Sequence, residues 1–150
     1  MKTENQTNHM AKRMDKAVIS IVEDDASVRE AMENLMKAIG YQTVAFESGE
    51  AFLDSSATVE TACLILDIRM PGMNGLDLQR RLGLSGNRTP IVFVTAHWDD
   101  DARRRALQAG AVAFLLKPVS EADLLGAVSA ALKSCPKPTP SLPNQKNYEN

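Results

Sequence analysis

Charged and hydroxyl side chains stand directly after four apolar segments of the sequence. The acidic pair Glu23-Asp24 follows VISIV, Asp67 follows CLIL, Thr95 follows IVFV and Lys117 follows AFLL. If these ends converge, the carboxylates repel one another, by roughly 4 kcal/mol for a pair 4 Å apart at an effective dielectric of 20. A divalent ion such as Mg²⁺ relieves that repulsion, because it binds carboxylate oxygens and keeps waters that a substrate phosphate can replace.

These residue types together suit the transfer of a phosphoryl group. An aspartate such as Asp67 can attack phosphorus and form an acyl phosphate, which is a known kind of covalent intermediate. The metal ion and the Lys117 ammonium would neutralise charge on the transferring group, and the Thr95 hydroxyl would hydrogen-bond one of its oxygens. The sequence therefore predicts a site that accepts a phosphoryl group on Asp67.

Five short apolar segments predict the strands that would bring these residues together. They are VISIV (18–22), TVAF (43–46), CLIL (63–66), IVFV (91–94) and AFLL (113–116), and amphipathic segments separate them. Strands that are apolar throughout and alternate with helices indicate an α/β fold, with a doubly wound parallel sheet covered on both faces. Because the carboxyl ends of parallel strands meet at one edge, the polar side chains that follow them are expected to share one crevice.

Helical spacing of apolar residues is clearest in the first and last of the intervening segments. The pattern Ser27 to Glu30 and the pattern Ser120 to Asp123 are of the capping-box type, in which side chains satisfy the first free amides of a helix, so they are predicted to open these two helices. The helices are predicted at 28–39, 49–55, 75–83, 99–109 and 124–132.

The chain length and the composition at the two ends define one domain. With 150 residues, of which 44% are hydrophobic and 24% charged, the chain fits a single core. We assign residues 17–134 to this domain, residues 1–16 to a disordered polar leader, and residues 135–150 to a tail or linker. Four prolines within eight positions exclude a helix in that tail.

Several classes of function are excluded by charge and pattern. A net charge of −2 argues against direct nucleic-acid binding. No apolar run approaches the ~20 residues that span a bilayer and no secretory signal is present, so we expect a cytoplasmic protein without a membrane partner. The two cysteines, Cys63 and Cys135, suggest neither a disulfide framework nor a metal site. Neither GxGxxG nor GxxxxGK[ST] occurs, so a nucleotide site is not expected.

The ordered motifs IVEDD, LILDIRMPGMNGLDL, VTA and FLLKP resemble the receiver domain of bacterial two-component response regulators, over about residues 17 to 134. This resemblance implies a flavodoxin-like receiver fold with strand order 2-1-3-4-5. It also implies that Asp67 is the phosphoacceptor, that Glu23 and Asp24 are the metal-binding acidic pair, that Thr95 is the switch hydroxyl and that Lys117 is the lysine typical of the family.

The resemblance implies further details of the site. The main-chain carbonyl of Arg69 would also bind the metal ion, and its side chain, with that of His97, would border the phosphoryl group. Phe114 would be the aromatic residue that changes rotamer on activation, although packing in the core explains it equally well. The peptide bond between Lys117 and Pro118 would be cis, whereas the general frequency of X-Pro bonds favours trans. The segment GAVAFLLKP looks most like receivers whose output domain is a helix-turn-helix DNA binder.

The expected partners also follow from the resemblance. The phosphoryl donor would be a sensor histidine kinase or a phosphotransfer protein, and the face from the helix at 99–109 to the strand at 113–116 would bind an output protein or a second copy. Such a protein is a switch and not an enzyme with external substrates, although it catalyses its own phosphorylation and slow dephosphorylation. No output domain follows residue 134, so either a free-standing receiver or a chain cut in its linker is expected.

Less specific interpretations remain open for some of these features. Asp25 is expected to be solvated or to cap a helix. The helix at 99–109 is explained more simply as a solvated surface helix, in which three acid–base pairs at i, i+4 spacing each contribute ~0.2 to 0.5 kcal/mol. A phosphorylation-independent docking module of the same fold is the alternative function. A Mg²⁺-dependent phosphatase would usually carry a second aspartate two residues after the nucleophile, where this chain has Arg69.

Overall fold

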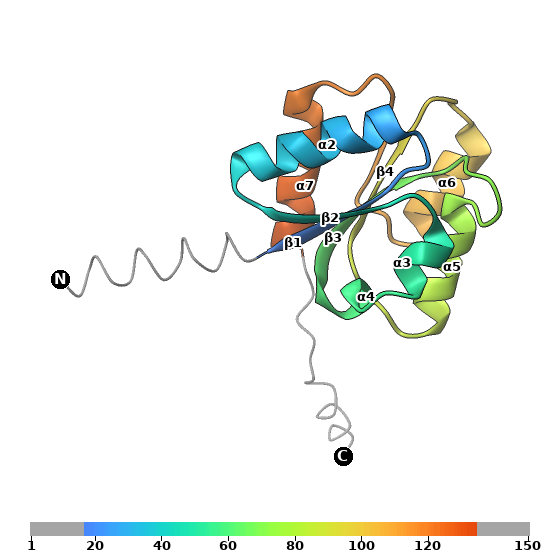
Figure 1. The fold of residues 1–150 in the computed structure, drawn as a ribbon. Helices are drawn as coiled ribbons and strands as arrows, with labels where there is room; N and C mark the ends of the chain where they lie inside the picture. Colours follow the sequence, from blue (N-terminus) through green and yellow to red (C-terminus); the bar gives the residue numbers. More distant parts are fainter. Residues whose placement is uncertain (1–16, 135–150) are drawn as a thin grey trace, which may run out of the picture.

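Each of the five predicted strands is present and pairs in parallel with its neighbours. The computed structural model describes residues 17–134, and the sheet order is β2-β1-β3-β4-β5, which confirms the predicted α/β fold class and strand order (Figure 1). The predicted leader at 1–16 and the tail at 135–150, including Cys135, lie outside the described residues. The strands are β1 (Val18–Val22), β2 (Gln42–Phe46), β3 (Thr61–Asp67), β4 (Ile91–Thr95) and β5 (Ala113–Leu116).

Helices cover both faces of the sheet. On one face lie α2 (Ala26–Ile39) and α7 (Glu121–Lys133), whose apolar residues share a cluster. Among residues 17–134, no helix has the length and the apolar character needed to cross a membrane. The other face carries α3 (Gly49–Leu53), α4 (Ala57–Glu60), α5 (Gly75–Leu84) and α6 (Asp100–Gln108).

The alternation of side chains along β3 divides the core into two layers. Cys63 and Ile65 pack with the helices α2 and α7, whereas Leu64 and Leu66 pack with α5 and α6 on the opposite face. All four side chains are fully buried. Burying a leucine or isoleucine contributes ~1.5 to 3 kcal/mol, so this central strand is held firmly from both sides and its end can place Asp67 accurately.

The start of α2 differs from the prediction, and a short helix was missed. The N-cap of α2 is Asp25, whose side chain accepts a hydrogen bond from the main-chain N–H of Val28, so the capping box predicted at Ser27 is wrong. Aspartate caps as well as serine does, and here it lies just after the strand. Ser120 is confirmed as the N-cap of α7. The four-residue helix α4 is too short to show helical periodicity.

The predicted acid–base pairs on α6 form only in part. Asp101 pairs with Arg105 at 3.5 Å and also with Arg104. Asp99 is instead the N-cap of the helix, and Asp100 accepts a hydrogen bond from the indole nitrogen of Trp98. These two carboxylates therefore fix the start of α6, where they also interact favourably with its positive end.

Candidate functional site

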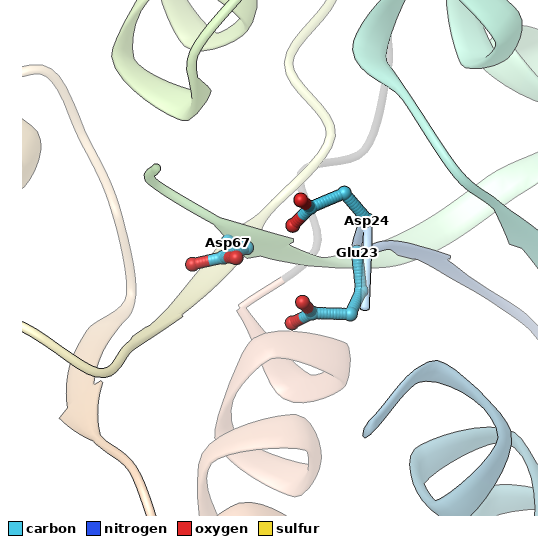
Figure 2. A group of neighbouring side chains, drawn as sticks. All are labelled: Glu23, Asp24 and Asp67. Carbon is cyan, nitrogen blue, oxygen red and sulfur yellow. The ribbon is translucent and has the colours of Figure 1, made fainter. Parts of the chain in front are cut away.

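Three carboxylates meet at the carboxyl edge of the sheet. Oxygen atoms of Glu23, Asp24 and Asp67 all lie within 4.8 Å of one another. Val22 pairs with Leu66 in the sheet, so the residues that follow these two strand positions are neighbours. Figure 2 shows the carboxylates of Glu23 and Asp24 directed from the end of β1 toward the end of β3, where Asp67 lies. Glu23 and Asp67 are buried, and Asp24 is exposed.

Lys117 brings a positive charge to the same cluster. Its Nζ lies 2.8 Å from Oε1 of Glu23 and 3.5 Å from Oδ2 of Asp67. Its main-chain N–H donates a hydrogen bond to the carbonyl oxygen of Thr95 at 2.7 Å, which ties the end of β5 to the end of β4. The peptide bond between Lys117 and Pro118 is cis, as the family resemblance implied and against the general preference for trans.

The environment of Asp67 disfavours its charged form. Burial and the nearby Glu23 raise the pKa of Asp67 from 3.8 to about 6, although Lys117 acts in the opposite direction. Burial by itself lowers the pKa of Lys117, but the hydrogen bond to Glu23 and the charges of Asp67 and Glu23 outweigh burial and raise it. Three carboxylates beside one lysine leave an excess of negative charge and several oxygen ligands, which fits a small divalent cation.

The raised pKa predicts that the metal-free protein loses stability as Asp67 ionises. Below pH 3.8 the carboxyl is protonated in both states, so it has no effect on stability; between 3.8 and about 6 the folded state holds the proton longer, and stability falls as the pH rises. Above about pH 6 this destabilisation has reached its full size. In EDTA, Asp67→Asn is therefore expected to be more stable than the parent at pH 7.5, but not at pH 4, in urea titrations.

A matched variant separates this effect from a general change of charge. Asp54, at the end of α3, is an exposed aspartate for which Asp→Asn is the same chemical change. Because Asp54 is exposed, Asp54→Asn is expected to change the free energy of unfolding only slightly. A stability gain of Asp67→Asn that did not grow from pH 4 to pH 7.5 would contradict the raised pKa of Asp67.

Thr95 ends the strand next to that of Asp67, and His97 follows two residues later in the loop. Asp67 pairs with Val94 in the sheet, so Thr95 is one residue further along β4. Thr95 is 1% exposed. Its hydroxyl accepts a hydrogen bond from the main-chain N–H of His97 at 3.2 Å and lies 3.4 Å from the His97 carbonyl oxygen. Within residues 17–134 no hydrogen bond joins Thr95 to Asp67. The His97 side chain is exposed.

Phe114 is packed between a buried ring and an exposed one. Its ring centroid lies 6.1 Å from that of Phe93 and 5.7 Å from that of Trp98, which contacts it edge-on. Phe114 is 8% exposed, whereas Trp98 is 51% exposed and has the guanidinium of Arg103 5.8 Å from its ring centroid. The aromatic residue is therefore in an inward position, next to the loop that links β4 to α6.

The loop after β3 carries Arg69 and ends at α5. The side chain of Arg69 is exposed and borders a cavity of about 510 Å³ that Met70, Leu76 and Arg105 also line. No hydrogen bond within residues 17–134 occupies the main-chain carbonyl oxygen of Arg69. Asn74 closes this loop with a capping box, a pattern that the letters N-G-L-D would have revealed in the sequence.

Two residues that position the site were not singled out from the sequence. A Cβ atom on Gly75 would lie 2.3 Å from the carbonyl oxygen of Asp67, so only glycine allows this loop to pass so close to the strand end. Nη1 of Arg29 donates a hydrogen bond to the carbonyl oxygen of Glu23 at 2.8 Å. The only sequence feature that points to the role of Gly75 is its place in a glycine-rich loop. No sequence feature points to the role of Arg29, because it resembles any polar residue of a helix.

Comparison with known proteins gives a family and relatives that agree with the fold and the acidic cluster. The model of the "Response regulator receiver domain" family matches residues 19–129. Response regulator protein TmoT of Ectopseudomonas mendocina is 44% identical over 127 residues, which are 85% of this chain and 58% of that protein. This chain thus spans about three fifths of the length of that curated relative.

Solved structures show the same fold. Response regulator StyR is 41% identical with a TM-score of 0.75, covering 80% of this chain and 61% of that chain. The structure titled FixJ-N is 30% identical with a TM-score of 0.75, covering 82% and 98%. These likenesses also confirm the subfamily that the segment GAVAFLLKP indicated. With its sheet order, its acidic cluster and these matches, the chain belongs to the response regulator receiver domain family.

Proposed function

We propose that this receiver domain accepts a phosphoryl group on Asp67 from a sensor histidine kinase or a phosphotransfer protein, in the presence of Mg²⁺. The observation that carries the proposal is the cluster of Glu23, Asp24 and Asp67, with oxygens within 4.8 Å of one another and Lys117 beside two of them. Membership of the family supports a kinase as the donor, and a receiver domain is not a conventional enzyme.

The metal ion would be held by oxygen atoms only. Its ligands would be the carboxylates of Glu23, Asp24 and Asp67 and the main-chain carbonyl of Arg69, which suits a hard cation such as Mg²⁺. When bound, Mg²⁺ neutralises negative charge on the phosphoryl group. It also favours the ionised form of Asp67, which is the form that can act as a nucleophile.

The chain's own side chains account for the transfer step. A carboxylate oxygen of Asp67 forms a bond to phosphorus while the bond from phosphorus to the donor's histidine nitrogen breaks, and the electron pair of that bond leaves with the imidazole. Lys117 exchanges its contact with Asp67 for one with the phosphoryl oxygens. Thr95 turns its hydroxyl from the main chain of His97 to a phosphoryl oxygen, whose charge makes it the stronger acceptor.

The same exchange of contacts would shift the protein between two conformations. Movement of Thr95 acts on the loop to α6, whose Trp98 packs against the ring of Phe114. The face from α6 to β5 would then change shape and bind an output protein or a second copy. A shift from 1:99 to 99:1 needs ~5.5 kcal/mol of differential interaction with the phosphoryl group. A cytoplasmic location, where histidine kinases present their phosphoryl groups, is part of this proposal.

Phosphoryl uptake is expected to depend on Mg²⁺ and on Asp24. Incubation with acetyl phosphate and Mg²⁺ should add one phosphoryl group, measured by intact mass, and EDTA should prevent this. Because Asp24 supplies one of the charged ligands, Asp24→Asn is expected to raise the Mg²⁺ concentration needed for half-maximal uptake by at least about tenfold.

Asp25→Ser is the matched control for this experiment. Asp25 is adjacent and acidic but caps α2, and serine preserves the cap, so its Mg²⁺ requirement should equal that of the parent. If the parent binds Mg²⁺ and gains no phosphoryl group, the receiver does not work by phosphorylation, and a phosphorylation-independent docking module becomes the better account.

A further inference from the structure

The connection between β1 and α2 has only three residues, and it must present two carboxylates of the acidic cluster in a fixed direction. Glu23 is fixed by its own side chain, which accepts hydrogen bonds from Lys117 through Oε1 and from the main-chain N–H of Asp25 through Oε2. Within residues 17–134 the carboxylate of Asp24 accepts no hydrogen bond, and it is exposed. Its direction therefore depends on the main chain that carries it (Figure 2).

Arg29 holds that main chain from the side of α2. Its Nη1 donates a hydrogen bond of 2.8 Å to the carbonyl oxygen of Glu23 and a weaker one of 3.4 Å to that of Asp24. On the other side, the main-chain N–H of Glu23 donates to the carbonyl oxygen of Phe46 at 3.1 Å. Arg29 thus ties the two peptide units that flank Asp24 to α2, and the peptide unit before them is tied to β2.

The hydrogen bonds of Arg29 can hold the carboxylates of Glu23 and Asp24 in place without neutralising their charge. Arg29 binds carbonyl oxygens and leaves the carboxylate oxygens available to a cation, whereas Lys117 contacts the carboxylates of Glu23 and Asp67 directly. A guanidinium stays charged at any working pH, and one of its nitrogens carries two hydrogens that can serve two acceptors. An arginine one turn into the helix is therefore well suited to this task.

We propose that Arg29 is a positioning residue that directs the Glu23-Asp24 pair toward Mg²⁺. This inference rests on the proposed function, because it concerns the affinity of the same acidic cluster for the cation. Outer groups that hold metal ligands in place typically change metal affinity by 10- to 100-fold when they are removed. Arg29 contributes in this way although it contacts neither the metal ion nor the phosphoryl group.

A positioning role and a purely electrostatic role of Arg29 predict opposite changes in the affinity for Mg²⁺ when Arg29 is removed. If Arg29 acted only through its charge, its removal would reduce repulsion of the incoming cation, and the affinity for Mg²⁺ would rise. If it acts by holding the main chain, its removal frees Asp24, and the affinity falls. Arg29→Lys keeps the charge but cannot reproduce the double contact of one guanidinium nitrogen, so the charge account predicts no change for this variant and the positioning account predicts a loss.

Calorimetric titration of the purified full chain with Mg²⁺ decides between these accounts. We expect a dissociation constant about tenfold higher than that of the parent for Arg29→Met and about threefold higher for Arg29→Lys. Arg80→Met is the matched control, because Arg80 lies on α5 and, within residues 17–134, its only ion pair is with the half-exposed Asp77. The affinity of this variant for Mg²⁺ should equal that of the parent. Thermal unfolding of each variant in EDTA checks that it is folded before the titration.

The outcomes separate this inference from the proposed function. Affinity in Arg29→Met equal to or above that of the parent overturns the positioning role and leaves the metal site intact. A parent chain that binds no Mg²⁺ overturns the metal site itself, and the inference with it. If Arg29→Met is unfolded in EDTA, Arg29→Lys carries the test alone, and an affinity equal to that of the parent overturns the inference.

Discussion

Replacing Lys117 with methionine is expected to slow phosphoryl uptake by about 100-fold. The ammonium lies 2.8 Å from Glu23 and 3.5 Å from Asp67, where it can follow the charge that develops on the transferring group. Removal of one preorganised group that stabilises such charge typically costs 10²- to 10³-fold in rate. The rate is measured by following the phosphorylated mass over time with acetyl phosphate at saturating Mg²⁺.

The same variant is expected to be less stable without the metal ion. Glu23 is only 1% exposed, and Lys117 is the cation that compensates its buried charge. Removing one partner of a buried pair leaves the other uncompensated, which typically costs 3 to 5 kcal/mol, so we expect a loss of about 3 kcal/mol at pH 7.5 in EDTA. Saturating Mg²⁺ should recover part of this loss, because it replaces the missing positive charge.

Lys37→Met is the control for both measurements. Lys37 also pairs with a carboxylate, Glu33, at 3.2 Å, but both side chains are on the surface of α2. Exposed pairs of this kind contribute ~0.3 to 0.5 kcal/mol, so uptake and stability should be nearly those of the parent. Uptake in Lys117→Met at the parental rate, with the protein folded, would show that Lys117 has no part in the transfer.

Replacing Gly75 with alanine is expected to cause a large loss of stability. The added Cβ would lie 2.3 Å from the carbonyl oxygen of Asp67 and 3.0 Å from the Cα of Ile68, and both are main-chain atoms that cannot rotate away. The main-chain N–H of Gly75 also donates a 2.8 Å hydrogen bond to the carbonyl oxygen of Ile68, so separation of the two segments breaks this bond too. We expect a loss of about 3 kcal/mol or more in the free energy of unfolding, measured by urea titration.

Gly126→Ala provides the matched control, because it makes the same change in the helix α7. A Cβ at Gly126 would meet no atom within 4 Å, and alanine is the better helix former by ~1 kcal/mol, so this variant should be more stable than the parent. A loss of stability for Gly75→Ala and a gain for Gly126→Ala would show that the loss comes from the close packing at the end of β3. A stable Gly75→Ala protein with parental Mg²⁺ affinity would contradict the tight approach of the loop to Asp67.

The arrangement of the strands and the residues at their ends could be predicted from the sequence, and for physical reasons. The apolar runs are buried on both faces, so their hydrophobic pattern is continuous and easy to recognise. Parallel pairing then requires their ends to meet at one edge, which places Asp67 next to the strand that leads to Glu23. The same rule puts Lys117, which directly follows β5, at this edge, and its side chain reaches the carboxylates of Glu23 and Asp67 from there.

Contacts that depend on the main chain could not be predicted in the same way. Arg29 looks like a surface residue of an amphipathic helix, and only the path of the loop from β1 shows that its guanidinium reaches two carbonyl oxygens. The sequence offered both Ser27 and Asp25 as caps for α2, and Asp25 is confirmed; aspartate and serine cap helices equally well, so the point where the strand ends decided between them. The roles of Thr95, Arg69 and Phe114 during a switch stay predictions, because they concern a change between two conformations.

The most direct test of the central claim is to trap the phosphorylated residue chemically. An acyl phosphate on aspartate is reduced by borohydride to homoserine, so the purified chain is treated with acetyl phosphate and Mg²⁺, reduced, digested and analysed by peptide mass spectrometry. The account predicts homoserine at position 67 and none when EDTA replaces Mg²⁺. Homoserine at position 24 or 25, or no homoserine although the parent binds Mg²⁺, would contradict it.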